Sequence, residues 1–195
     1  MKNVEGIILA AGFSRRMEKF KMELPLDGKN ILERCIEVMK SVCDQIIVVS
    51  GHHFERIQKI TSNLPNVKTV VNANYERGMF SSIRKGVREI KADRFFIIPG
   101  DQPLVKIETY KKMLEIDSDI VSPRCNGKKG HPILLQSKLI KEIIKMSDNG
   151  ILRDFIHKIN DYKLDVDDIG IHLDVDTLED YKKLQKYYNE EYREK

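Results

Sequence analysis

The sequence predicts an α/β fold in which helices cover both faces of a largely parallel sheet. Two patterns alternate along the first 122 residues. Short apolar runs, such as 45–50 with its Ile-Ile-Val-Val core, have the length of buried strands. The segments between them, such as 31–42, place apolar residues at the i, i+3 and i+4 spacing of amphipathic helices. This alternation is typical of parallel strands joined by crossover helices.

The expected elements follow one another in a regular order up to residue 122. The first strand, 4–10, runs into Gly12, and a polar loop separates it from the helix expected over 31–42. The strand expected over 94–98 is stopped by Pro99 and Gly100, which punctuate regular structure. The other expected strands are 45–50, 67–71 and 119–122, and the other expected helices are 54–61, 81–90 and 107–114.

The second part of the chain is less regular. In the last helix, Leu178, Tyr181, Leu184 and Tyr188 lie on one face, and Thr177 is the expected N-cap. We find no internal repeat or low-complexity linker, so residues 1–195 are expected to form a single domain. The expected elements are strand 132–136, helices 137–145 and 151–159, strands 162–166 and 171–175, and helix 177–188.

Composition and charge exclude several classes of protein. Hydrophobic residues make up 41% and charged residues 33% of the chain, as in a globular protein with a sizeable core. The net charge of +4 is too small to predict a nucleic-acid or membrane surface, and no apolar run approaches the roughly 20 residues of a membrane span. The three cysteines have no CxxC spacing, so we expect free thiols and a cytoplasmic protein.

The first unusual segment, 9–17, follows the first strand and reads Leu-Ala-Ala-Gly-Phe-Ser-Arg-Arg-Met. Its small residues allow the backbone to approach a ligand closely, and successive exposed N–H groups in such a turn attract anions. Arg16 and Lys21 would add full positive charges suited to phosphate. The alternative is a tight turn followed by a solvated basic stretch. The segment is neither a GxxxxGK[ST] loop nor a GxGxxG turn.

Two further segments carry carboxylates beside expected strands. Asp101 directly follows the strand 94–98 and its Pro-Gly stop, where a carboxylate could hold Mg²⁺ alongside substrate phosphates. Alternatively, Asp101 caps the helix that starts near Lys106 or belongs to the turn. Asp174 and Asp176 point to the same side if the strand 171–175 continues, and one of them could be a second metal ligand. Alternatively, both simply favour the start of the following helix.

Five motifs occur in one order along nearly the whole chain, and together they carry a family resemblance. LAAGxSxRM with a lysine four residues on matches 9–17 and Lys21, and GDQP matches 100–103. The others are N-x-x-[WY]-x-x-G-M-x-S-S at Asn72, Tyr75, Gly78, Met79, Ser81 and Ser82, G-H-P at 130–132, and D-x-D-T-x-E-D at 174–180. A D-x-G-x-R motif is only approximated by Asp148, Gly150 and Arg153. The chain thus resembles the MobA-like nucleotidyltransferases, specifically their molybdenum cofactor cytidylyltransferase branch.

The resemblance implies a Rossmann-like three-layer sandwich of the nucleotide-diphospho-sugar transferase type. It implies one nucleotidyltransferase domain that uses Mg²⁺ and transfers CMP from CTP to a molybdopterin-type acceptor, releasing pyrophosphate. The implied nucleotide-binding residues are Leu9, Ala10, Ala11, Gly12, Ser14, Asn72, Gly78, Ser81 and Ser82, and those facing the acceptor are Gly130, His131 and Pro132. The implied catalytic residues are Arg16, Lys21 and Asp101, and the implied metal ligands are Asp101 with Asp176 or Asp174.

The nucleotide and the acceptor are less closely specified by the resemblance. Guanylyltransferase relatives have LAGG where this chain has LAAG, so Ala11 favours CTP over GTP. Another phosphorylated acceptor, such as a sugar or polyol phosphate, is an alternative. A third alternative is a non-catalytic accessory protein that delivers cofactor to a molybdoenzyme. The molybdoenzyme would then be a partner of this chain. Glu18, where the family usually has glycine, favours that third reading, whereas Arg16, Lys21 and Asp101 count against it.

Overall fold

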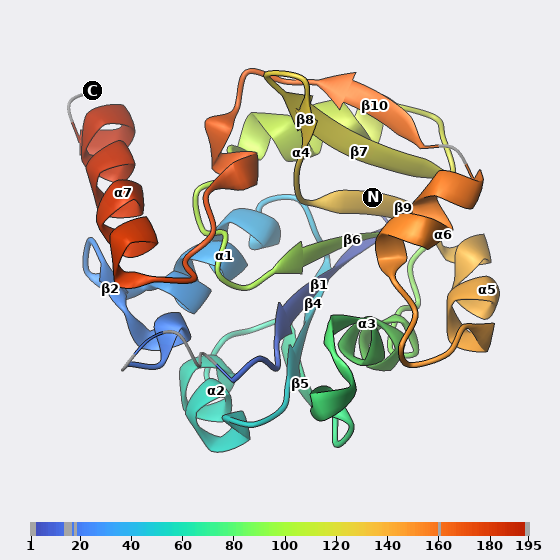
Figure 1. Ribbon diagram of the computed structural model, residues 1–195, viewed down its shortest axis with the longest axis horizontal. Coiled ribbons are helices and arrows are strands. Elements are labelled where there is room, and N and C mark those ends of the chain that lie inside the picture. The colour runs from blue at the N-terminus through green and yellow to red at the C-terminus, as the bar shows by residue number, and fades with distance from the viewer. Residues whose placement is uncertain (1–2, 14–16, 18, 160, 194–195) are drawn as a thin grey trace.

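The computed structural model describes residues 3–13, 17, 19–159 and 161–193, and its centre is a mixed sheet of eight strands (Figure 1). Seven strands lie in the order β10-β7-β9-β6-β1-β4-β5, and β8 pairs antiparallel with the last two residues of β7. Of these, β9 runs antiparallel to β6 and β7, whereas β6, β1, β4 and β5 are parallel. The bounds are β1 Val4–Ala10, β4 Gln45–Ser50, β5 Val67–Val71, β6 Arg94–Pro99, β7 Ile120–Cys125, β8 Lys128–Lys129, β9 Ile133–Gln136 and β10 Tyr162–Asp165.

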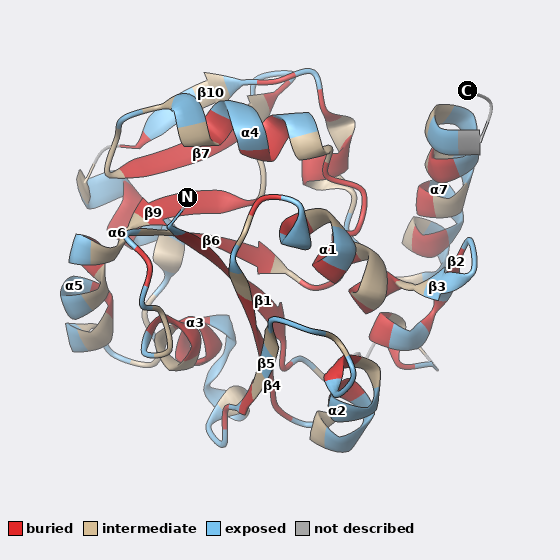
Figure 2. Ribbon diagram, turned by 180° about the vertical axis from the view of Figure 1, so that it is seen from behind, coloured by how far each residue is buried: buried red, intermediate tan, exposed pale blue. Residues whose placement is uncertain are grey.

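Helices cover both faces of this sheet, which gives three layers (Figures 1 and 2). The alternation of side chains along β1 shows why: Ile8 packs into one apolar core, and Ile7 and Leu9 pack into the other. The first core includes residues of α1 (Ile31–Lys40), α2 (Phe54–Thr61) and α4 (Ile107–Glu115). The second includes residues of α3 (Met79–Val87), α5 (Ile140–Lys145) and α6 (Leu152–Ile159). The predicted α/β class is confirmed.

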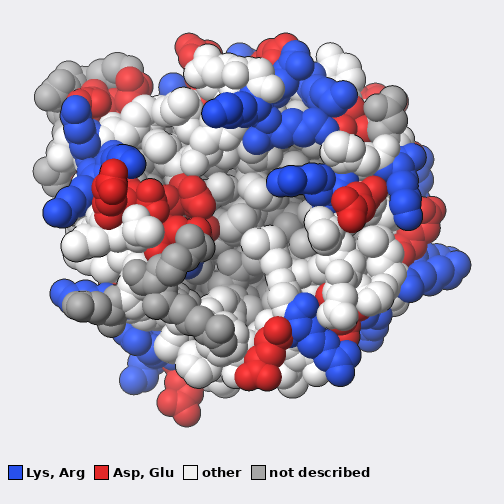
Figure 3. Space-filling model, viewed as in Figure 1, with Lys and Arg blue, Asp and Glu red and all other residues white. Residues whose placement is uncertain are grey.

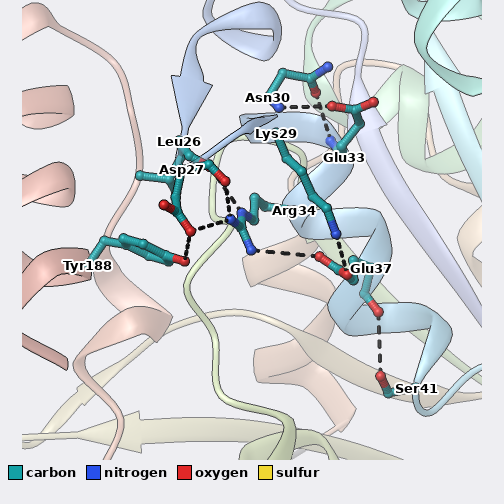
Figure 4. Close-up of polar contacts among 9 residues, drawn as sticks. All are labelled: Leu26, Asp27, Lys29, Asn30, Glu33, Arg34, Glu37, Ser41 and Tyr188. Carbon is teal, nitrogen blue, oxygen red and sulfur yellow. Dashed lines mark hydrogen bonds and ion pairs between the residues drawn. The ribbon is translucent and has the colours of Figure 1, made fainter. Parts of the chain in front are cut away.

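A third apolar cluster lies beside the sheet and joins the last helix, α7 (Leu178–Tyr188), to a short hairpin of β2 (Pro25–Leu26) and β3 (Lys29–Asn30). Polar contacts tie the hairpin in place (Figure 4): Arg34 donates from Nε to the Leu26 carbonyl at 3.1 Å, and the Tyr188 hydroxyl donates to Asp27 Oδ2 at 2.8 Å. This hairpin was not predicted from the sequence. It anchors the chain just after Lys21.

The last helix begins where the sequence predicts. Thr177 is its N-cap and forms a capping box with Asp180. Tyr181 and Leu184 are buried as expected, but Leu178 is 59% exposed, which corrects its predicted place on the buried face. As the first residue of the helix, Leu178 lies outside the cluster that Tyr181 and Leu184 form with the hairpin.

The segment predicted as a strand over 171–175 is not one. Residues Ile169–His172 form a 3₁₀ helix, and the following residues have no regular structure. The cause is Asp168, whose buried carboxylate accepts hydrogen bonds from the Gly170 and Lys106 amides, both at 2.9 Å, and from the Thr109 hydroxyl at 2.6 Å. These contacts turn the chain before a strand can form. Asp174 and Asp176 are therefore not side-by-side residues of a strand.

No helix in the described part of the chain has both the length and the apolar character needed to cross a membrane.

Candidate functional site

The predicted site segments meet at the carboxyl ends of β1, β4 and β6. The Gly100 amide donates to the Leu9 carbonyl at 2.9 Å, and a Cβ on Gly51 would lie 2.8 Å from the Ala11 carbonyl oxygen. Leu9, Ala10 and Ala11 are buried, and Gly12 is exposed at the start of the loop. Such close backbone approach explains why residues without bulky side chains occur at these strand ends. Ser14, Arg16 and Glu18 lie outside the described residues.

At this edge Lys21 contacts Asp101 and Asp176, which lie 80 and 155 positions after it in the sequence. The Lys21 ammonium donates to Asp101 Oδ2 and, at 3.0 Å, to Asp176 Oδ1. Burial alone would lower the pKa of Lys21, but the Asp101 and Asp176 carboxylates raise it above its ordinary value. Lys21 is therefore a charged ammonium shared by two carboxylates.

The carboxylates fit a divalent cation that completes its ligand shell with substrate. Asp101 is 7% exposed, and its Oδ1 has no hydrogen-bond partner among the described residues. A buried carboxylate oxygen without a partner is costly, and a bound cation would satisfy it. The described residues contain no cluster of three or more acidic, histidine or cysteine side chains placed to hold a metal. Asp101 and Asp176 would thus suit Mg²⁺ that is bound mainly through phosphate oxygens and water.

Asp101 belongs to the turn that follows β6, as one alternative expected, but it does not cap the helix near Lys106, so the capping alternative is wrong. Asp168 receives the Lys106 amide at the start of α4, as described above. Asp174 lines the neighbouring cavity, and burial together with the nearby Asp101 and Asp176 raises the pKa of its carboxyl. It therefore faces a different part of the site from the carboxylate of Asp176, which pairs with Lys21.

Asn72, Ser81 and Ser82 form one buried cluster. The Asn72 side-chain amide donates to the Ser81 and Ser82 hydroxyls at 2.8 and 3.0 Å, and Ser81 donates to the Gly78 carbonyl at 2.8 Å. Gly78 has a φ of +95°, a conformation that side chains rarely adopt. The cluster therefore fixes the Gly78 turn and presents Met79, which is 59% exposed, at the surface.

A cavity of about 720 Å³ opens between α3, α6 and the 3₁₀ helix Ile169–His172. Gly130 and His131 line it, whereas Pro132 is buried and does not line it. His131 is held by its amide, which donates to the Ile171 carbonyl at 3.2 Å. Figure 3 shows a hollow in this face, with Lys and Arg side chains above and to the right of it and acidic side chains to its left. The cavity is lined by the basic side chains Arg77, Lys129 and Arg153 and by the histidines His131, His157 and His172. Its apolar lining residues include Leu9, Met79, Phe80, Ile83, Ile97, Ile133, Ile151, Leu152, Ile156 and Ile171.

Two ion-pair networks that the sequence analysis missed hold the cavity walls. Asp148 accepts from Arg77 at 2.9 Å and also from Arg84, which ties the segment 147–153 to α3. Burial works against the ionised form, but the two guanidinium groups lower the pKa of Asp148. Lys129 pairs with the buried Asp161 at 2.7 Å. The approximate D-x-G-x-R motif was a signal for Asp148, whereas no local pattern points to Asp161.

His131 should make stability depend on pH. Burial lowers the pKa of His131 from 6.5 to about 4, opposed by Asp101 and reinforced by His172. Between pH 6.5 and 4, His131 is therefore protonated in the unfolded chain but neutral in the folded chain. Because the unfolded chain binds more protons, the free energy of unfolding should fall as pH falls from 6.5 toward 4. In His131→Gln the fall should be smaller. Urea denaturation at neutral pH and at about pH 4.5 measures the difference, and the exposed His157→Gln should behave as the unmodified protein. An equal fall in His131→Gln would contradict the assignment.

Comparisons with known proteins identify the family of the chain. A family model described as a MobA-like NTP transferase domain matches residues 6–163. The chain is 28% identical over 191 residues to the molybdenum cofactor cytidylyltransferase of Escherichia coli (strain K12), covering 97% of this chain and 100% of that protein. It is 28% identical over 198 residues to a "Probable molybdenum cofactor guanylyltransferase" of Bacillus cereus (strain AH187), covering 95% of this chain and 98% of that protein.

The solved structure of Rv0371c from Mycobacterium tuberculosis H37Rv is also similar. It superimposes with a TM-score of 0.85 at 26% identity, covering 95% of this chain and 98% of that chain. A structure of the same protein in complex with manganese superimposes with a TM-score of 0.80 at 23% identity, covering 94% and 98%. Both confirm the sandwich expected from the sequence.

Proposed function

Since the chain belongs to the MobA-like NTP transferase family and is a nucleotidyltransferase, we propose that it transfers CMP from CTP to a molybdopterin-type acceptor. Pyrophosphate is released, Mg²⁺ is the metal, and residues 1–195 act as one nucleotidyltransferase domain. The observation that carries the proposal is the Lys21 ammonium between Asp101 and Asp176, beside a cavity lined by basic side chains. The Lys21, Asp101 and Asp176 side chains suit a nucleoside triphosphate with its metal ion, and the cavity suits a phosphorylated acceptor.

The nucleotide would bind over the loop after β1. Leu9, Ala10, Ala11 and Gly12 supply a backbone that a triphosphate can approach closely. Arg16, Lys21 and the Ser14 hydroxyl would neutralise and orient its phosphates. The Gly78 turn, held by the cluster of Asn72, Ser81 and Ser82, would border the base or ribose. Ala11 favours CTP, and GTP is the second candidate because a guanylyltransferase relative is also 28% identical to this chain.

The acceptor would occupy the cavity. Its apolar walls suit a flat ring system, and Arg77, Lys129 and Arg153 suit a phosphate. His131, whose pKa is about 4, is neutral near physiological pH, so it would contact the acceptor through hydrogen bonds rather than charge. Asp174, on the cavity side of Asp101, would face the acceptor phosphate or a metal-bound water.

The reaction needs alignment and charge neutralisation more than proton transfer. A phosphate oxygen of the acceptor attacks the α-phosphorus, and pyrophosphate leaves from the opposite side. Bound Mg²⁺ would neutralise charge that develops on the phosphate oxygens. Asp101 and Asp176 would hold it, while Lys21 and Arg16 stabilise the leaving pyrophosphate. A phosphate nucleophile is already ionised near neutral pH, so no general base is required.

Pyrophosphate release tests the proposal. Each of the four nucleoside triphosphates is offered with molybdenum-loaded molybdopterin, with Mg²⁺ or with a chelator. We expect release with CTP and Mg²⁺ and none with the chelator. Release with GTP alone would show that GTP, not CTP, is the nucleotide of the same reaction. Release only with a sugar or polyol phosphate would show that the acceptor is not molybdopterin. No release with any nucleotide, together with tight binding of molybdopterin, would contradict the proposal and favour an accessory protein.

Asp148 should affect binding of the acceptor more than the chemical step. It joins the segment 147–153, which forms one wall of the cavity, to Arg77 and Arg84. Asp148→Asn removes the ion pairs that hold this wall. We expect the KM for the acceptor to rise about tenfold, with a smaller change in the KM for CTP. Steady-state kinetics with each substrate varied in turn measures this. Asp154→Asn, an exposed carboxylate on α6, is the matched control. An equal rise in both KM values would contradict the assignment.

A further inference from the structure

Lys21 takes the place that a metal ion would take between the two carboxylates. Its ammonium contacts Asp101 Oδ2 and Asp176 Oδ1, and 13% of its side chain is exposed. An ammonium that donates to two carboxylates neutralises much of their charge, as a bound cation would. The negative charge of the two carboxylates is therefore already balanced in part by a cation that belongs to the chain itself, while Asp101 Oδ1 has no hydrogen-bond partner among the described residues.

The backbone around Lys21 is fixed, whereas its side chain can move. Phe20 and Met22, on either side of it, are buried at 4% and 3% exposure, and the hairpin that follows is tied to α1 and α7. The four-carbon stem of a lysine allows the ammonium to swing without movement of the backbone. Exchange of the ammonium for another cation therefore needs only a rotation of this side chain.

A free divalent cation would have to compete with this ammonium. It would either lie beside a like charge in a partly buried site or displace Lys21 from two ion pairs. A nucleoside triphosphate changes the balance, because its phosphates offer the ammonium new anionic partners and offer the metal further oxygen ligands.

We propose that Lys21 is an internal counter-ion that excludes free divalent cations from the Asp101–Asp176 pair, so that the metal enters together with the nucleotide. This inference rests on the metal-ligand role of Asp101 in the proposed function. It assigns to Lys21 a role before the reaction that is separate from its role toward the triphosphate. It also predicts that removal of a positively charged side chain strengthens metal binding while weakening activity.

The test is binding of Mn²⁺, added as its chloride without nucleotide, measured by electron paramagnetic resonance. We expect Lys21→Met to bind Mn²⁺ about ten- to a hundredfold more tightly than the unmodified protein. Lys19→Met, which removes an exposed lysine two positions away, should bind as the unmodified protein. Lys21→Arg keeps the positive charge, so it should bind Mn²⁺ as weakly as the unmodified protein. This variant tests the inference even if Lys21→Met folds poorly. Equal or weaker binding by folded Lys21→Met, or tight binding by Lys21→Arg, would overturn the inference.

Asp101→Asn in both backgrounds separates this inference from the proposed function. We expect the added affinity of Lys21→Met to vanish in the double variant Lys21→Met/Asp101→Asn. If Lys21→Met binds no more tightly than the unmodified protein and Asp101→Asn weakens both, the counter-ion role fails and the metal ligand stands. If Asp101→Asn leaves Mn²⁺ binding unchanged in both backgrounds, the metal-ligand role itself fails, and the inference fails with it.

Discussion

Asp101→Asn is expected to lower the rate of nucleotidyl transfer by about a hundred- to a thousandfold. Asparagine has nearly the same shape, but it removes the charge that would hold the metal and that pairs with Lys21. Because Lys21 keeps Asp176 as a partner, the fold should persist. Pyrophosphate release under saturating CTP, acceptor and Mg²⁺ measures the rate, and thermal unfolding confirms that the variant is folded.

The matched control for Asp101→Asn is Asp44→Asn. Asp44 is an exposed carboxylate just before β4, at the opposite end of the sheet from the site. We expect its variant to retain full activity. If folded Asp101→Asn retained most of its activity, neither a metal ligand nor a partner essential to Lys21 could be located at this residue.

Asp168→Ala is expected to lower the free energy of unfolding by about 3–5 kcal/mol, the largest stability loss that we predict. Its carboxylate is 1% exposed and accepts from two backbone amides and from the Thr109 hydroxyl. Removing it leaves the buried Gly170 amide and Thr109 hydroxyl without this acceptor and also removes the acceptor of the half-buried Lys106 amide. A Cβ on the neighbouring Gly170 would lie 2.0 Å from the Leu104 carbonyl oxygen, so the turn has no room to rearrange.

Asp167→Ala is the control for Asp168→Ala. Asp167 is exposed, and its backbone carbonyl, which the substitution keeps, accepts from the Lys106 ammonium at 3.4 Å. Urea denaturation should show a loss of less than about 0.5 kcal/mol for Asp167→Ala. Equal losses in the two variants would show that the Asp168 carboxylate does not hold the turn.

The parts of the site that follow buried strands were predictable from the sequence. Asp101 lies directly after an apolar run and a Pro-Gly stop, and the carboxyl ends of parallel strands share one edge of the sheet. The structure brings Lys21 and Asp101 together at this edge. Local patterns also located Thr177, because a capping residue acts on its own helix.

The parts that depend on distant contacts were not predictable. The segment 171–175 has the apolar pattern of a strand, but Asp168 and Thr109, 59 positions apart, determine that it turns. The cavity walls likewise depend on Arg84 with Asp148 and Lys129 with Asp161, pairs separated by 64 and 32 positions. Periodicity reports which face of an element is apolar, but it contains no information on which charged side chains meet across the fold.

Transfer of a radioactive label tests the central claim most directly. CTP labelled at the α-phosphorus and CTP labelled at the γ-phosphorus are incubated separately with the protein, Mg²⁺ and molybdenum-loaded molybdopterin. Nucleotidyl transfer predicts that the α label appears in the acceptor and that the γ label appears only in pyrophosphate. Appearance of the γ label in the acceptor would show phosphoryl transfer instead, and would contradict the account.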